Sequence, residues 1–160
     1  MRVGVLTISD RGSRGERVDT AGPAVVTLVE AQGLEVAARD LVPDERDQIA
    51  AKLRQWADEE QLDLVLTTGG TGLALRDVTP EATADVADRY VPGFAEAMRA
   101  AGRRITPLAD LSRATAVTRG RTLIINLPGS EKGARESLEA IIELIPHAVG
   151  VLHDDTEHPR

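Results

Sequence analysis

The sequence contains no cysteine among its 160 residues. This absence excludes disulfide bonds, catalysis by a thiolate and zinc sites built on cysteine. Aromatic residues are almost as scarce, because Trp56, Tyr90 and Phe94 are the only ones. The hydrophobic core must therefore consist mainly of Ala, Val, Leu and Ile, which make up most of the 42% of hydrophobic residues.

Positive charge is also in short supply. The chain has 19 basic and 26 acidic residues, which gives a net charge of −7. Nucleic acids and anionic membranes attract basic surfaces, so this balance argues against both as partners. No apolar run approaches the roughly 18 residues of a membrane span, and Met1-Arg2-Val3 leads into an apolar segment rather than a signal peptide. We expect a cytoplasmic protein whose ligands are small molecules.

The first half of the chain alternates between strand and helix patterns. Residues 3–8 form a nearly continuous apolar run, as in strands covered on both faces. Two further strands are predicted over 35–42 and 62–66, with a helix over 20–30 and another that begins at Asp44. Because crossovers between parallel strands are right-handed, this β-α-β-α-β order predicts a largely parallel sheet.

The second half adds an antiparallel element. Its predicted elements are helices over 79–88, 92–101 and 107–112, strands over 114–118 and 121–127, and a helix from Glu131 that Pro146 interrupts. Arg119-Gly120 joins the two strands and predicts a hairpin. We therefore predict an α/β fold, a three-layer αβα sandwich around a mostly parallel sheet with one antiparallel strand. A single domain is expected over residues 1–153, followed by a polar tail over 154–160.

One segment combines glycine and threonine in a way that suits phosphate binding. The run Thr67-Thr68-Gly69-Gly70-Thr71-Gly72 follows the third predicted strand. Its glycines permit positive φ angles, so that backbone N–H groups can converge on an anion. Glycines also serve tight turns, and the run has neither the Walker A pattern nor G-x-G-x-x-G spacing. Both interpretations stay open at this level.

Two aspartates follow predicted strands and can reach the same crevice. Asp44 comes after the second strand and Asp77 after the third. A hard Mg²⁺ ion binds one or two carboxylates together with substrate phosphates, which favours a site for phosphoryl or nucleotidyl transfer. The alternatives are that Asp44 only caps a helix and that Asp77 forms a surface ion pair with Arg76.

Two other polar loops lie at predicted strand ends. The loop 9–15 carries Arg11 and Arg14, which can supply positive charge. The turn 126–130, followed by Lys132, offers a hydroxyl and a lysine at a helix start, which suits a second anion. The first loop is equally compatible with a solvated surface, and Pro-Gly-Ser is also ordinary turn chemistry.

These segments together resemble a known family. Residues 67–72 followed by Arg76-Asp77-Val78-Thr79-Pro80-Glu81-Ala82 resemble the signature of the MogA/MoaB-type molybdenum-cofactor proteins, which include the G domain of gephyrin. Further similar segments are Ser9-Asp10-Arg11, Pro43-Asp44, Pro92-Gly93-Phe94 and Asn126-Leu127-Pro128-Gly129-Ser130. The resemblance spans essentially the whole chain.

The resemblance implies molybdopterin adenylyltransferase activity, in which ATP and molybdopterin give adenylylated molybdopterin and pyrophosphate with Mg²⁺. It makes Asp44 and Asp77 the catalytic and metal-binding residues. The implied binding residues are Ser9, Asp10, Arg11, Thr68, Gly69, Gly70, Thr71, Gly72, Asn126, Pro128, Gly129, Ser130 and Lys132. It also implies a homotrimer and a molybdate-inserting enzyme as a partner.

Two rival functions remain compatible with the same residues. One is a molybdopterin-binding module of the MoaB type without catalytic activity. The other is a nucleotide pyrophosphatase that resembles the competence-damage-inducible domain and hydrolyses substrates such as ADP-ribose. The presence of both Asp44 and Asp77 favours an enzyme, and Arg76-Asp77-Val78-Thr79-Pro80 fits the molybdopterin branch better.

Overall fold

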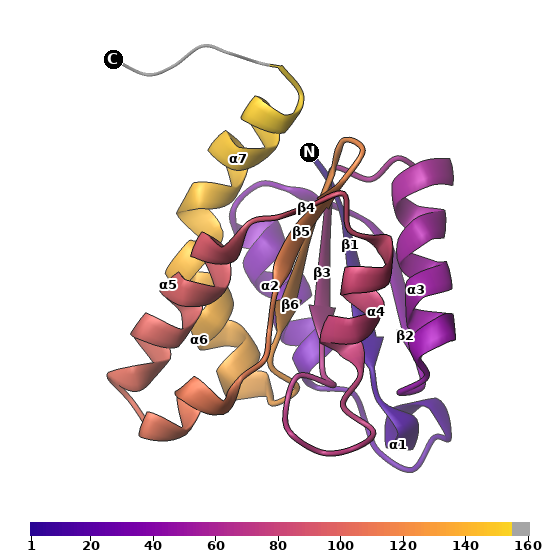
Figure 1. Ribbon diagram of the computed structural model, residues 1–160, viewed down its shortest axis with the longest axis vertical. Coiled ribbons are helices and arrows are strands. Elements are labelled where there is room, and N and C mark those ends of the chain that lie inside the picture. The colour runs from indigo at the N-terminus through magenta and orange to yellow at the C-terminus, as the bar shows by residue number, and fades with distance from the viewer. Residues whose placement is uncertain (155–160) are drawn as a thin grey trace.

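A single sheet organises the computed structural model, which describes residues 1–154 (Figure 1). Its six strands lie in the order β2-β1-β3-β6-β5-β4. They are β1 (Arg2–Ile8), β2 (Glu35–Val42), β3 (Leu64–Thr68), β4 (Arg89–Tyr90), β5 (Ala116–Arg119) and β6 (Thr122–Leu127). The neighbours from β2 to β6 pair in parallel, whereas β5 runs antiparallel to both β6 and β4. The predicted mostly parallel sheet with one antiparallel strand is confirmed.

Helices connect the strands and cover both faces of the sheet. They are α1 (Asp10–Ser13), α2 (Ala21–Ala31), α3 (Arg46–Arg54), α4 (Thr79–Val86), α5 (Pro92–Arg103), α6 (Glu131–Ile141) and α7 (Ile145–Leu152). A π-helical turn η1 (Gln55–Glu59) extends α3, and two 3₁₀ turns, η2 (Pro107–Leu111) and η3 (Ile142–Leu144), follow α5 and α6.

Alternating side chains of the strands build two cores, one on each face. Val5 and Leu66 pack with residues of α2, α5, α6 and α7. Leu6 and Val65 point the other way and pack with residues of α3, η1 and α4. Figure 1 shows these two groups of helices on opposite sides of the sheet. Strands β3 and β6 are buried along their whole length, which explains the consecutive apolar residues over 64–66 and 123–125.

Several boundaries differ from the sequence predictions for local reasons. The loop after β1 contains the four-residue helix α1, whose N-cap Ser9 accepts a hydrogen bond from the backbone of Gly12. The sequence does not predict strand β4, because two residues are too short to show a periodicity. Pro146 stands in the first turn of α7, so the break falls just before it, where proline is well tolerated. Of the predicted tail, residues 155–160 lie outside the described residues.

The chain order of the strands creates a crevice between β1 and β3. The chain passes from β1 to β2 on one side and then to β3 on the other side of β1. In open α/β sheets, ligands bind beyond the carboxyl ends of the strands at such a switch point. The loops that follow β1, β2 and β3 all lie at this edge, which places the glycine-rich segment and Asp44 together.

Candidate active site

A polar cleft of about 340 Å³ occupies the switch point. Segments that are far apart in the sequence supply its walls: the loops after β1, β2, β3 and β6, and the start of α2. The lining residues are Ile8, Ser9, Gly12, residues 17–21, Asp44, residues 68–70, Asp77, Gly129 and Ser130. The fold therefore brings Asp44 and Asp77 to one cleft with the glycine-rich loop and the turn after β6.

The glycine-rich loop lies directly against both carboxylates. Gly70 has a φ of +66°, and a Cβ placed on it would stand 3.1 Å from Asp44 Oδ1 and collide with the Thr79 hydroxyl. A Cβ on Gly72 would stand 2.8 Å from Asp77 Oδ2. A side chain at either position would therefore displace the carboxylate next to it. The glycines thus leave room for both carboxylates and for the Thr79 hydroxyl beside the loop backbone.

Asp44 is held by the loop that follows β1. The backbone N–H of Asp10 donates to Asp44 Oδ2 at 2.8 Å, and the backbone N–H of Asp44 donates to Asp10 Oδ1 at 3.0 Å. Helix α3 begins at Arg46, with Glu45 as its N-cap residue. The alternative in which Asp44 only caps a helix is therefore wrong. Burial raises the pKa of Asp44, and the negative charges of Asp10 and Asp77 raise it further.

Arg76 belongs to this network rather than to Asp77. Its guanidinium donates two hydrogen bonds to the Asp10 carboxylate, both at 2.9 Å, and one to Glu45 at 2.9 Å. These bonds hold the pKa of Asp10 below its usual value. Asp77 instead accepts from the backbone N–H of Ala74 at 3.0 Å. The alternative in which Asp77 forms a surface ion pair with Arg76 is therefore wrong, because Arg76 pairs with Asp10 and Glu45.

The hydroxyl of Thr68 marks a polar position that the protein leaves open. Thr68 is 1% exposed, and its Oγ1 is one of two buried side-chain atoms in residues 1–154 without a hydrogen-bond partner. Leaving a buried hydroxyl unsatisfied costs about 1–3 kcal/mol. Thr68 lines the cleft, so a ligand group that reached this hydroxyl would supply its missing hydrogen bond.

Other predicted binding residues are placed differently. Ser130 lines the cleft, and its hydroxyl caps α6 by accepting from the backbone of Gly133. Asn126 is fully buried, and its amide donates to the hydroxyls of Thr67 at 3.1 Å and Thr83 at 2.9 Å. The amide thus ties β6 to β3 and α4 instead of facing the cleft. The exposed Arg11 and Lys132 lie outside the lining of this cleft.

The start of α2 contributes cleft residues that the sequence interpretation missed. Asp19 accepts from the Thr7 hydroxyl at 2.6 Å and from the backbone N–H of Gly22 at 3.0 Å. Arg17 adds a cationic side chain to the lining. The N-terminal end of an 11-residue helix carries partial positive charge, which suits an anion in the cleft. The sequence does contain a signal for this position, because Asp19 stands just before the helix predicted over 20–30, where aspartate commonly caps a helix.

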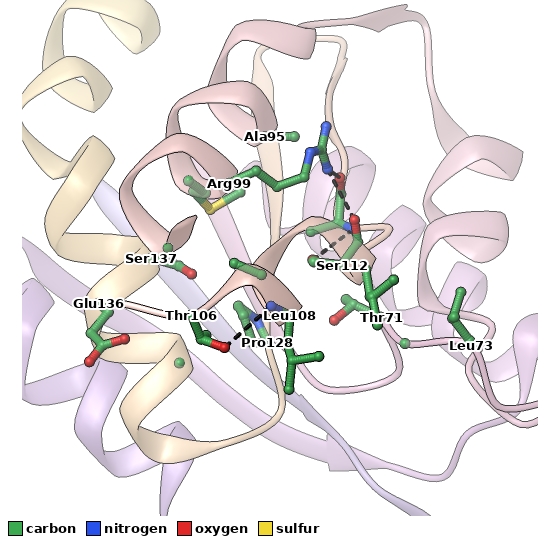
Figure 2. A pocket seen from close by; sticks show the side chains of 17 residues that line it. Thr71, Leu73, Ala95, Arg99, Thr106, Leu108, Ser112, Pro128, Glu136 and Ser137 are labelled. Atoms are coloured by element: carbon green, nitrogen blue, oxygen red, sulfur yellow. Dashed lines mark hydrogen bonds between the residues drawn. The ribbon is translucent and has the colours of Figure 1, made fainter. Parts of the chain in front are cut away.

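A second, mainly apolar pocket of about 480 Å³ lies on the other side of the glycine-rich loop (Figure 2). Its walls come from α5, η2, α6 and the turn before α6, and they include Met98, Leu108 and Pro128. Arg99 donates to the backbone oxygens of Ser112 and Ala114 at 3.2 and 3.3 Å and so fixes one wall. Thr71, Gly72 and Pro128 line this pocket, whereas residues 68–70 and Gly129 line the cleft. The glycine-rich loop and the turn after β6 therefore line both the cleft and the apolar pocket.

The donor set of the cleft fits a magnesium ion that is shared with phosphates. No group of three or more His, Cys, Asp or Glu side chains suited to a metal occurs in residues 1–154. Mg²⁺ in phosphate-transfer sites is usually held by one or two carboxylates together with the phosphates. The carboxylates of Asp44 and Asp77 are hard oxygen donors of this kind, and Thr68, whose hydroxyl has no hydrogen-bond partner, lines the same cleft. The residues thus fit an ion that arrives with a phosphate ligand.

The chain is similar to known proteins over most of its length. Residues 4–147 match the family model described as a probable molybdopterin binding domain. A molybdopterin adenylyltransferase from Helicobacter pylori J99 is 46% identical over 154 residues, which cover 95% of this chain and 88% of the relative. The molybdopterin adenylyltransferase of Escherichia coli K12 is 46% identical over 144 residues, covering 88% of this chain and 73% of the relative. The crystal structure of the molybdopterin biosynthesis enzyme MoaB from Thermus thermophilus superposes with a TM-score of 0.91 at 59% identity, covering 96% of each chain.

Proposed function

The chain belongs to the family of probable molybdopterin binding domains, and we propose that it is a molybdopterin adenylyltransferase, which transfers AMP from ATP to the terminal phosphate of molybdopterin and releases pyrophosphate. The relatives that carry this name match most of the chain. The observation that carries the proposal is the meeting of Asp44 and Asp77 with the glycine-rich loop in one cleft. A module that only binds the pterin has no need of two carboxylates beside a phosphate cradle.

The reaction joins two anions. An oxygen of the molybdopterin phosphate forms a bond to the α-phosphorus of ATP, and the bond from that phosphorus to the bridging oxygen of the β-phosphate breaks, so that pyrophosphate leaves. A phosphate monoester is already ionised near neutral pH, and the step needs no general base. Catalysis then consists of aligning the two phosphates and neutralising their charge.

The cleft residues divide these tasks. Asp44 and Asp77 would hold Mg²⁺, which supplies neutralisation of the phosphate charge when bound. The backbone of the glycine-rich loop and the Thr68 hydroxyl hold phosphate oxygens, and the start of α2 adds positive potential. Ser9 and the turn at Gly129 and Ser130 complete the lining of the cleft.

The apolar pocket suits the heterocycle of one substrate. ATP and molybdopterin both carry a planar ring system joined to phosphate, and a pocket of about 480 Å³ has the volume of a small-molecule site. Because the pocket adjoins the cleft across Thr71 and Gly72, a ring bound there keeps its phosphate beside the aspartates. The predicted homotrimer, the molybdate-inserting partner and the cytoplasmic location stay predictions. No helix within residues 1–154 has the length and apolarity needed to span a bilayer.

A substrate comparison tests the proposed function. The purified protein is incubated with Mg²⁺ and either ATP plus molybdopterin or ADP-ribose, and pyrophosphate, AMP and adenylylated molybdopterin are quantified. We expect one pyrophosphate for each adenylylated molybdopterin and no turnover of ADP-ribose. Hydrolysis of ADP-ribose without transfer would instead identify a pyrophosphatase, and molybdopterin binding without any turnover would identify a binding module.

A further inference from the structure

Arg113 makes a group of contacts that the catalytic roles above do not use. Its Nε donates to the carbonyl oxygen of Gly72 at 2.7 Å, and its Nη2 donates to the carbonyl oxygen of Asp77 at 2.6 Å. Its Nη1 donates to the carboxylate of Glu81 in α4. The backbone N–H of Arg113 also donates to the carbonyl oxygen of Thr71 at 2.9 Å. One arginine thus reaches both ends of the loop 72–77.

The other contacts that hold this loop are hydrogen bonds and ion pairs. The side chains of Leu73 and Leu75 are 67% and 98% exposed, so no apolar side chain anchors it to the core. Within the loop, the backbone N–H of Asp77 donates to the carbonyl of Ala74 at 2.9 Å. Arg76 ties the outer part of the loop to Asp10 and Glu45. Just beyond the loop, Thr79 donates its backbone N–H to the carbonyl of Gly70 at 3.1 Å and its hydroxyl to the carbonyl of Gly69 at 2.8 Å. Arg113 adds bonds to the carbonyls at both loop ends, through a fork of donors that a guanidinium provides and an ammonium group does not.

We propose that Arg113 is a positioning residue for adenylyl transfer: by bonding to the carbonyls of Gly72 and Asp77, it holds the Asp77 carboxylate against the glycine-rich loop. The inference rests on the proposed function for its kinetic consequence. Arg113 lies outside the lining of both hollows, so it acts through Asp77 and not on the substrate. A displacement of about 1 Å in a reacting geometry lowers rates on the order of 100-fold.

A matched arginine elsewhere in the fold provides the control. Arg119 forms a bidentate pair with Asp58 at 2.9 and 2.6 Å and donates to the carbonyl of Val86 at 3.1 Å. Arg119 lies in β5 opposite Thr122, the first residue of β6. This end of the sheet is the one away from the cleft. The side chains of Arg113 and Arg119 are 34% and 25% exposed. Each guanidinium makes three hydrogen bonds, which the substitution removes.

The experiment compares Arg113→Gln with Arg119→Gln in the intact protein. Steady-state kinetics with ATP and molybdopterin give kcat and KM, thermal melting gives stability, and hydrogen exchange reports the amides of Ala74, Asp77 and Thr79. We expect Arg113→Gln to lower kcat on the order of 100-fold with little change in either KM. We also expect faster exchange at these three amides, whereas Arg119→Gln shows neither effect.

Two outcomes would overturn the assignment of Arg113. One is a kcat that falls no further than in Arg119→Gln, and the other is exchange of the loop amides at the parent rate. If Arg113→Gln does not fold, Arg113→Lys undergoes the same measurements, because it keeps the charge beside Glu81 but loses the fork. If the parent protein itself gives no adenylylated product, the proposed function fails, and the exchange data still decide whether Arg113 fixes the loop.

Discussion

Asp10 and Asp44 each donate a backbone N–H to the carboxylate of the other, at 2.8 and 3.0 Å. This reciprocal contact joins the loop after β1 to the loop after β2 and aims one oxygen of Asp44 at the glycine-rich loop. Arg76 lies in the loop that carries Asp77 and forms an ion pair with Asp10, so it joins this third loop to the other two. The two proposed metal ligands are therefore connected through Asp10 and Arg76.

Substitution of Asp10 tests this connection. Asp10→Ala removes the acceptor for the Asp44 backbone N–H and the partner of Arg76, so we expect a roughly tenfold or greater loss in apparent Mg²⁺ affinity during turnover. Asp58→Ala is the control, because it removes the carboxylate of a comparable bidentate arginine pair far from the cleft. Titration of activity with Mg²⁺ provides the measurement. Equal Mg²⁺ dependence in both variants would show that Asp10 does not orient Asp44.

The role of Asp77 separates catalysis from binding. Asp77→Asn keeps the size of the side chain but removes the charge that would hold the ion. We expect kcat for adenylylation to fall on the order of 100-fold or more, with an almost unchanged dissociation constant for molybdopterin. Product formation and equilibrium binding of molybdopterin are measured on the same preparation. Adenylylation at the parent rate would remove Asp77 from the mechanism.

The glycine-rich loop can be tested with two alanine substitutions that share the same backbone cost. Gly70 and Gly15 have φ angles of +66° and +71°, so alanine at either position costs about 1–2 kcal/mol of stability. At Gly70 the new Cβ also meets Thr79 and Asp44, whereas at Gly15 it meets nothing within 4 Å. We therefore expect similar or larger destabilisation for Gly70→Ala and a loss of activity in that variant alone. Comparable activities in the two variants would contradict the close approach of Asp44.

The apolar pocket is tested by filling it. Ser137 lines the pocket from α6 (Figure 2), whereas Glu139 on the same helix is exposed and does not line it. Ser137→Phe occupies space that a heterocycle needs, so we expect the KM of one substrate to rise roughly tenfold while the other changes little. Glu139→Phe serves as the control for an added aromatic ring. Unchanged KM values for ATP and molybdopterin in Ser137→Phe would show that neither ring binds there.

The response to acid follows from two aspartates with opposite shifts. Burial raises the pKa of Asp44 above its ordinary value of 3.8, so this carboxylate takes up its proton at a higher pH than a free aspartate does. The hydrogen bonds from Arg76 lower the pKa of Asp10 below 3.8, so its stabilising contribution is present above that pH and is lost as the pH falls through the lowered value.

As the pH is lowered, we therefore expect activity to be lost at a higher pH than the folded structure is. As the pH decreases, protonation of Asp44 weakens Mg²⁺ binding, while the same protonation favours the folded state because the folded pKa is the higher one. The pH profile of kcat/KM and the pH dependence of the melting temperature are compared. Coincident loss of activity and of folded structure would contradict a separate titration of Asp44.

The sequence by itself determined the local features of this protein. Apolar runs such as 3–8 and 62–66 locate strands because a strand covered on both faces needs apolar side chains at consecutive positions. The strand-end positions of Asp44, Asp77 and residues 67–72 follow from those runs. Because the strands run parallel, the loops that follow them lie at one edge of the sheet. The fold class and the gathering of both aspartates in one cleft could therefore be predicted from the sequence.

Only the tertiary structure decided which polar side chains serve the cleft and which serve the fold. The partners of Arg113 lie 41, 36 and 32 positions away along the chain, so nothing near it in the sequence distinguishes it from a surface arginine. Asn126 stands in a motif at the cleft but turns its amide into the core, because alternate residues of a strand face opposite sides of the sheet. Hydrogen bonds between distant segments form only when packing brings donor and acceptor together, and packing is a property of the whole chain.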